Sequence, residues 1–202
     1  WRVFSFGGKA GQIWLFGSKE RKTEVTKKDR NITLVGMPAS GKSTVGVLLA
    51  KRLGFSFVDV DIVIQEREKR LLKEIIAQEG LDGFMAVENR INASLDVDRS
   101  VIAPGGSVIY GKEAMEHLKE ISTIVYLKLS YEDVKARLGN LVDRGVVLKD
   151  GMTLLDLYHE RVPYYERYAD ITVDETGQTA GETVDCLRKM MEERLGMDGR
   201  RS

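Results

Sequence analysis

The segment GMPASGKS (36–43) has the residue types and spacing of a loop that binds the phosphates of a nucleoside triphosphate. Gly36 and Gly41 let the backbone curl so that its N–H groups face inward. These groups and the N-terminus of the next helix can bind phosphate oxygens. Lys42 would contact the β- and γ-phosphates, and the Ser43 hydroxyl would bind Mg²⁺. A turn without nucleotide is the alternative, but the Lys-Ser pair between a strand and a helix favours ATP.

A second cation that could act on ATP lies in the segment DRGVVLKDGMT (143–153), which has the composition of a mobile loop between two helices. Arg144 could close over ATP and stabilise the charge of the transferring phosphate. A solvated surface arginine fits the same sequence. The residues predicted to bind ATP are Gly36, Ala39, Ser40, Gly41, Lys42, Ser43, Thr44 and Arg144.

Two carboxylates, Asp59 and Asp61, alternate with apolar residues in the segment FVDVDIVIQ (57–65). Residues i and i+2 of a strand point to the same face, and carboxylates are rarely buried without a partner. Asp59 could reach the magnesium shell through water. Asp61 could accept a hydrogen bond from an acceptor hydroxyl and take its proton. Alternatively, one or both cap the following helix, because Asp is a favoured N-cap.

Two further features could bind an acceptor. The segment APGGSVIY (103–110) contains Gly105 and Gly106, which permit close approach of the backbone to a substrate hydroxyl or the γ-phosphate, although a plain turn fits as well. Arg161 lies among apolar and aromatic residues and would share a helix face with Leu157 and Tyr165 if the helix continued through Pro163. Such an arginine needs an anion, either a carboxylate of the protein or one of a substrate.

These residues must be positioned by alternating strands and helices. We predict strands at 32–36, 55–61, 100–104, 122–129 and 169–174. Helices are expected at 42–53, 62–97 with a break near Gly80–Gly83, 113–121, 131–140, 153–168 with an interruption at Pro163, and 181–195. Alternation of this kind predicts a three-layer α/β/α fold with a five-stranded parallel sheet, in which ligands bind beyond the carboxyl ends of the strands.

Composition suggests one domain and gives no sign of a nucleic-acid-binding or membrane-binding protein. Basic and acidic residues number 31 each, so charge gives no argument for nucleic acid or membrane binding. The single cysteine, Cys186, fits a reducing compartment, and we expect a cytoplasmic monomer. We assign residues 31–197 to the domain, 198–202 to a tail, and 1–30 to an N-terminal extension or linker that can be disordered. A transit peptide or a fragment end would both fit residues 1–30.

Residues 31–196 resemble the shikimate kinase family. The resemblance rests on GMPASGKST, the FVDVD acid pair, the PGG turn, the lid-like DRG and ERVPYYERYA. It implies a P-loop kinase with a mobile lid that transfers the γ-phosphate of ATP to the 3-hydroxyl of shikimate, with Mg²⁺ as cofactor. It further implies catalytic roles for Lys42, Asp61 and Arg144, metal ligation by Ser43 and Asp59, and substrate binding by Asp61, Gly105, Gly106 and Arg161. The stretch after Asp174 would flank adenine.

Two positions depart from the family pattern. The family has Phe-Arg at the start of a helix, where the arginine helps to bind the substrate carboxylate, but this chain has Phe84-Met85. The third glycine of the family turn is Ser107 here. The ATP half of the site is therefore intact and the acceptor half altered. A kinase of another small hydroxylated metabolite and a catalytically weak nucleotide-binding regulatory protein remain alternatives, and a nucleoside monophosphate kinase fits less well.

Overall fold

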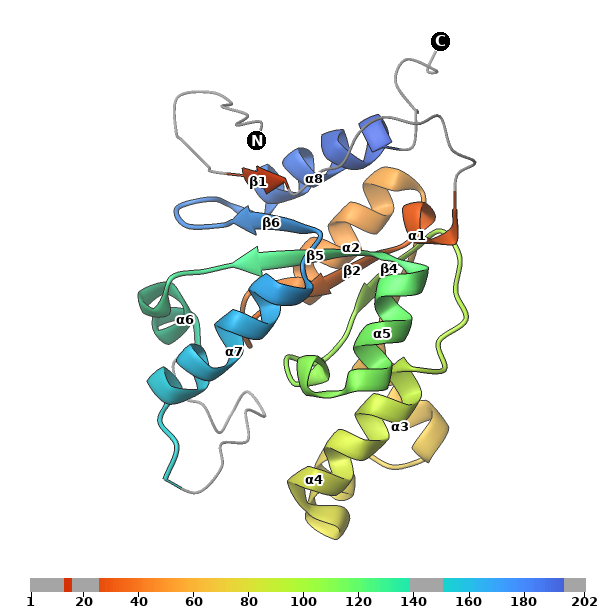
Figure 1. Ribbon diagram of the computed structural model, residues 1–202, viewed down its shortest axis with the longest axis vertical. Coiled ribbons are helices and arrows are strands. Elements are labelled where there is room, and N and C mark those ends of the chain that lie inside the picture. Colours follow the sequence, from red (N-terminus) through yellow and green to blue (C-terminus); the bar gives the residue numbers. More distant parts are fainter. Residues whose placement is uncertain (1–12, 16–25, 139–150, 195–202) are drawn as a thin grey trace.

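A parallel sheet forms the centre of the protein (Figure 1), whose computed structural model describes residues 13–15, 26–138 and 151–194. Its five parallel strands are β2 (Ile32–Val35), β3 (Ser56–Asp59), β4 (Ser100–Ala103), β5 (Thr123–Lys128) and β6 (Ile171–Asp174). Their order across the sheet is β6-β5-β2-β4-β3. All neighbouring pairs among them are parallel, which confirms the prediction from the strand–helix alternation.

A sixth strand lies at one edge of the sheet and was not predicted. This strand, β1 (Ile13–Leu15), pairs antiparallel with β6, with Ile13 opposite Val173. The short helix α1 (Lys27–Arg30) follows it and contacts β5 and the helix α5 (Lys112–Ile121). The N-terminal stretch that we assigned to an extension therefore contributes two short elements to the fold.

Helices cover both faces of the sheet (Figure 1). The helices α2 (Lys42–Leu53) and α8 (Ala180–Arg194) pack side by side on one face. The other face carries α5 and four further helices: α3 (Val60–Glu68), α4 (Leu72–Asn92), α6 (Tyr131–Leu138) and α7 (Leu154–Tyr168). The single turn η1 (Val108–Tyr110) connects β4 to α5. The molecule thus has the predicted three layers.

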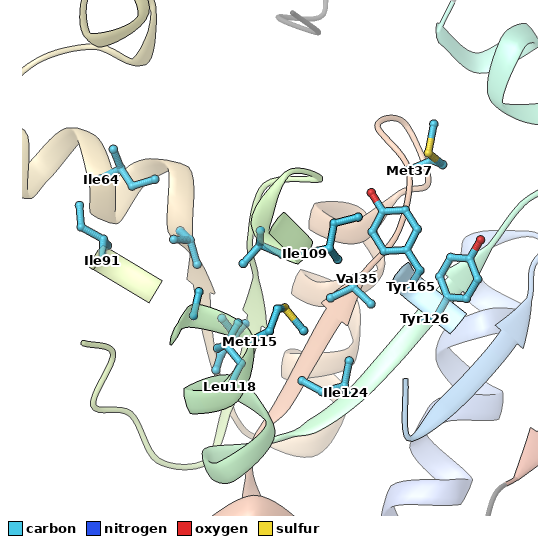
Figure 2. Close-up of a cluster of buried hydrophobic side chains, with 14 of the residues drawn as sticks. Val35, Met37, Ile64, Ile91, Ile109, Met115, Leu118, Ile124, Tyr126 and Tyr165 are labelled. Carbon is cyan, nitrogen blue, oxygen red and sulfur yellow. The ribbon is translucent and has the colours of Figure 1, made fainter. Parts of the chain in front are cut away.

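Each face of the sheet has its own apolar core. On the α2–α8 face, Val45 and Leu49 pack with Leu187 over strand residues such as Leu34 and Val125. Figure 2 shows the larger cluster on the opposite face, where Tyr126 of β5 and Tyr165 of α7 stack at 5.2 Å between ring centroids. Burial of apolar surface on both faces fixes the helices against the sheet, so the carboxyl ends of β2, β3 and β4 form a rigid platform.

Three local features test the sequence predictions. The predicted break in the long helix is confirmed, because Gly80 in α4 has φ 71° and ψ −175°. The predicted strand at 55–61 is too long, since β3 ends at Asp59 and α3 begins at Val60. The predicted interruption at Pro163 is wrong, because α7 continues from Leu154 to Tyr168. Proline costs a helix one hydrogen bond, and the buried residues on either side of it offset that loss.

Removing residues 1–30 is expected to change thermal stability and kinetics little. The described contacts of this stretch are at one edge of the sheet: β1 pairs with the edge strand β6, α1 contacts β5 and α5, and two ion pairs join Lys28 Nζ to Asp170 and Arg30 Nε to Asp98, each at 3.2 Å. Exposed ion pairs of this kind contribute about 0–1 kcal/mol each. Thermal unfolding of the full chain would be compared with deletions of residues 1–25 and 1–30. A large fall in melting temperature for the shorter deletion would show that the segment before α1 belongs to the core.

Candidate active site

The phosphate loop lies between β2 and α2, where a turn of the backbone needs glycine. Gly41 has φ 84° and ends the loop at the first residue before α2. At Gly36, an added Cβ would lie 2.8 Å from the carbonyl oxygen of Leu127, so no larger residue fits without movement. The loop therefore turns the N-terminal N–H groups of α2 toward the end of the sheet, which is the geometry that binds phosphate.

Lys42 is folded back onto this loop. Its Nζ donates hydrogen bonds to the carbonyl oxygens of Gly36 and Met37 at 3.0 and 3.1 Å. Burial and the nearby Arg161 guanidinium lower the pKa of Lys42 to about 8, and Asp61 opposes that shift. A polyphosphate beside the loop would favour the charged lysine, because an opposite charge within a few ångströms raises the pKa of an amine.

A cavity of about 750 Å³ lies beyond the carboxyl ends of β3 and β4 and reaches the phosphate loop. It brings together most of the residues singled out from sequence: Ala39, Lys42, Ser43, Asp59, Asp61, Gly105, Gly106 and Arg161. Four predicted ATP-binding residues do not line the cavity: Gly36, Ser40 and Gly41 belong to the loop, and Thr44 lies in the first turn of α2. Arg144 and most of the lid-like segment lie outside the described residues.

The two aspartates of the acid pair have different positions because α3 begins between them. Asp59 is the N-cap of α3, and its Oδ1 accepts a hydrogen bond of 3.1 Å from the backbone N–H of Asp61. The alternative that Asp61 caps this helix is therefore wrong. Asp61 lies in the first turn, and its side chain lines the cavity. Burial and the Asp59 carboxylate raise the pKa of Asp61, while Lys42 lowers it.

Arg161 brings a positive charge to the wall of the cavity. The residue is only 8% exposed, and it lies on the buried face of α7 with Leu157 and Tyr165, as the spacing predicted. Its Nε donates to the Tyr110 hydroxyl at 3.3 Å, and its guanidinium lies over the Tyr110 ring. Within residues 26–138 and 151–194 it forms no ion pair with a carboxylate. A buried arginine in this state is suited to bind an anionic group that enters the cavity.

The Pro-Gly-Gly turn needs its glycines because side chains crowd it from two sides. An added Cβ on Gly105 would collide with Glu88 Oε1, and one on Gly106 would lie 2.9 Å from an Arg161 guanidinium nitrogen. Tyr165 also donates a hydrogen bond of 2.7 Å to the carbonyl oxygen of Gly106. The backbone of the turn is thereby held between α4 and α7, with Gly105 and Gly106 lining the cavity.

Glu88 is a site residue to which the sequence assigned no role. It lies on α4, is 1% exposed and lines the cavity with Met85. Its Oε2 accepts a hydrogen bond of 2.6 Å from the Ser107 hydroxyl, and its Oε1 has no hydrogen-bond partner among the described residues. Burial raises the pKa of Glu88 to about 7. A sequence signal existed, because Glu88 falls on the same helix face as Phe84 and Ile91, where a carboxylate is rare.

This combination of fold and site defines a P-loop kinase whose acceptor is a small molecule. A family model described as shikimate kinase matches residues 38–192. The shikimate kinase of Persephonella marina is 35% identical over 157 residues, which cover 77% of this chain and 95% of that protein. The shikimate kinase of Vibrio parahaemolyticus is 36% identical over 168 residues, covering 82% and 98%. The chain belongs to the shikimate kinase family of ATP-dependent phosphotransferases.

Solved structures agree with this assignment. Shikimate kinase from Acinetobacter baumannii, solved in complex with shikimate, superposes with a TM-score of 0.70 at 31% identity, covering 83% of this chain and 94% of that one. Shikimate kinase from Aquifex aeolicus gives a TM-score of 0.70 at 29% identity, covering 84% and 99%. In the part of the chain that the structure describes, no helix is both long and apolar enough to span a bilayer.

Proposed function

We propose that the protein transfers the γ-phosphate of ATP to the 3-hydroxyl of shikimate in this cavity. Separate residues bind the phosphate, take the proton and bind the acceptor carboxylate. The observation that carries the proposal is the meeting of Lys42, Asp61 and Arg161 on the wall of one cavity. A phosphate-binding cation, a candidate base and an anion-binding arginine are the groups that phosphorylation of a hydroxy acid needs. Release of ADP in a coupled assay with shikimate as acceptor tests it directly.

The nucleotide is held by the phosphate loop and the first turn of α2. Backbone N–H groups of the loop bind the phosphate oxygens, and Lys42 leaves the carbonyl oxygens of Gly36 and Met37 to contact the β- and γ-phosphates. Ser43 and Asp59 fit Mg²⁺, because both residues line the cavity together with Lys42 and both side chains carry the oxygen ligands that Mg²⁺ prefers. The ion would neutralise charge on the β- and γ-phosphates. Arg144 would approach from the segment outside the described residues.

The acceptor lies between Asp61 and Arg161. Asp61 accepts the proton of the attacking hydroxyl, and its raised pKa brings it closer to the range in which a carboxylate is an effective base. Arg161 binds the carboxylate of the acceptor, and the backbone at Gly105 and Gly106 contacts the acceptor hydroxyls. These contacts orient the reacting hydroxyl toward the γ-phosphate. Positioning of this kind is a large part of the catalysis of phosphoryl transfer.

A second candidate is a kinase of another small hydroxylated metabolite, and Met85 favours it. Met85 lines the cavity at the position where the family has an arginine. Among the described residues that line the cavity, Arg161 is the one arginine. A screen of shikimate, homoserine, gluconate and nucleoside monophosphates as acceptors distinguishes the candidates. Binding of ATP without turnover on any of them would favour a regulatory protein instead.

Replacing Met85 with arginine is expected to lower the KM for shikimate about ten-fold or more, equivalent to a gain of ~1.4 kcal/mol in binding. The reason is that two arginines instead of one would hold the acceptor carboxylate, while kcat would change little. Met85→Leu is the matched control, since it changes shape slightly and adds no charge. Arg161→Ala should abolish measurable use of shikimate. Unchanged shikimate kinetics in Met85→Arg, with another acceptor phosphorylated by the parent, would contradict the shikimate assignment.

A further inference from the structure

The two departures from the family pattern, Ser107 and Met85, line the cavity together with one buried carboxylate, that of Glu88. Met85 and Glu88 are three residues apart on α4, so they lie on neighbouring positions of one helix face. Ser107 follows the Pro-Gly-Gly turn, and its hydroxyl donates to Glu88 Oε2 at 2.6 Å. An arginine at position 85 would lie one turn from Glu88, whereas methionine offers it no charge and no donor.

The Ser107 hydroxyl has no other structural task. Ser107 is the residue before η1, but its side chain makes no capping hydrogen bond to that turn. Its backbone has φ −86° and ψ −10°, a conformation that alanine and threonine also adopt. The one hydrogen bond of its side chain in the described structure is the bond to Glu88. Removing the hydroxyl therefore tests that bond and little else.

Glu88 lies against the Pro-Gly-Gly turn. Its Oε1 occupies the space that a side chain on Gly105 would need, and Asp61 Oδ1 lies 3.6 Å from the same point. The Ser107 hydrogen bond thus connects the C-terminal end of the turn to α4. Glu88 fills the space beside Gly105, so it limits the movement of the backbone there. A shift of Glu88 would move the turn and the space beside Asp61 together.

We propose that Ser107 is a positioning residue that replaces the missing cation at position 85: by fixing Glu88, it holds the Gly105–Gly106 backbone in place for the acceptor. This inference rests on the proposed function of the cavity as an acceptor site. It makes the two departures a coupled pair, because an arginine at position 85, three residues from Glu88 on α4, would offer Glu88 a second donor besides the Ser107 hydroxyl. The chain keeps an ordered acceptor turn although it lacks the family arginine.

The charges around Glu88 show why it needs a donor. The groups that face it are Asp61 of α3, Lys42 of α2, and Arg161 and Tyr165 of α7. Burial raises the pKa of Glu88 most, Asp61 adds to that effect, and the Ser107 hydrogen bond lowers it. With a pKa of about 7, Glu88 is ionised above neutral pH and accepts a strong hydrogen bond there. Loss of the Ser107 hydroxyl removes an effect that lowers this pKa, so the pKa should rise.

The test removes the hydroxyl with Ser107→Ala and keeps it with Ser107→Thr as the matched control. In Ser107→Ala the KM for the acceptor should rise about ten-fold, the equivalent of one charge-assisted hydrogen bond, with kcat and the KM for ATP within two- to three-fold of the parent. Ser107→Thr should stay close to the parent. In a Met85→Arg background, Ser107→Ala should have a much smaller effect on KM, because Glu88 then has another donor.

A second measurement needs no acceptor. Titration of the Glu88 carboxyl, followed by ¹³C NMR and assigned with Glu88→Gln, should show a higher pKa in Ser107→Ala than in the parent and Ser107→Thr. An unchanged pKa of Glu88 in Ser107→Ala would overturn the proposal, and so would an unchanged KM for the acceptor. The proposal would also fail if Ser107→Ala raised that KM equally in the parent and in the Met85→Arg background. If the parent does not use shikimate, the KM is measured with the acceptor found in the screen. Failure of the shikimate assignment is then distinct from failure of the Ser107 proposal.

Discussion

Replacing Asp61 with asparagine is expected to lower kcat by about 10²–10⁴-fold, the usual contribution of a general base. Asparagine keeps the shape of the side chain in the first turn of α3 but cannot take the proton of the acceptor hydroxyl. ATP affinity should stay within a few-fold of the parent, because Asp61 lies on the acceptor side of the cavity and is not the cap of the helix. Steady-state kinetics and calorimetric titration with ATP measure the two effects separately.

Controls for this experiment come from the same helix. Glu66→Gln removes an exposed carboxylate from α3 and should leave kcat unchanged. Asp59→Asn keeps a good N-cap residue and removes the charge beside the phosphate loop, so its main effect should be on the magnesium dependence of the reaction. Turnover that survives intact in Asp61→Asn would show that Asp61 is not the base.

Replacing Lys42 with alanine is expected to reduce kcat by about 10²–10³-fold, the cost of losing one preorganised donor to a developing charge. ATP binding should also weaken, since Lys42 is the one lysine or arginine of the loop itself. Lys51→Ala on the exposed side of α2 is the matched control and should behave like the parent. Equal ATP affinity and activity in Lys42→Ala and the parent would refute the assignment of this loop.

The lowered pKa of Lys42 adds a pH dependence to this prediction. An amine is charged below its pKa, and in the nucleotide-free site burial lowers that value to about 8. ATP affinity of the parent should therefore fall as the pH rises through about 8, because binding must then take up a proton. Lys42→Ala should lack this dependence. A parallel decline in both proteins would assign it to another group.

The amino-acid sequence by itself determined the sheet, its parallel strands and the phosphate loop. These features depend on local periodicity and on residues whose spacing is short, such as Gly36 and Lys42, so neighbouring residues specify them. The helix face shared by Leu157, Arg161 and Tyr165 followed from the helical repeat in the same way. Even the break at Gly80 was a local property of glycine.

Tertiary structure alone decided how the acceptor side is built. Because α3 begins at Val60, Asp59 is its N-cap and Asp61 lies in its first turn on the cavity wall. Strand periodicity places both aspartates on one face and therefore could not separate these two roles. Packing on the sheet carried α7 through Pro163 where propensity alone predicts an interruption. The bond between Ser107 and Glu88 joins residues 19 positions apart. Such a contact depends on how two elements pack on the sheet, and no local pattern in either segment specifies which residues will be in contact.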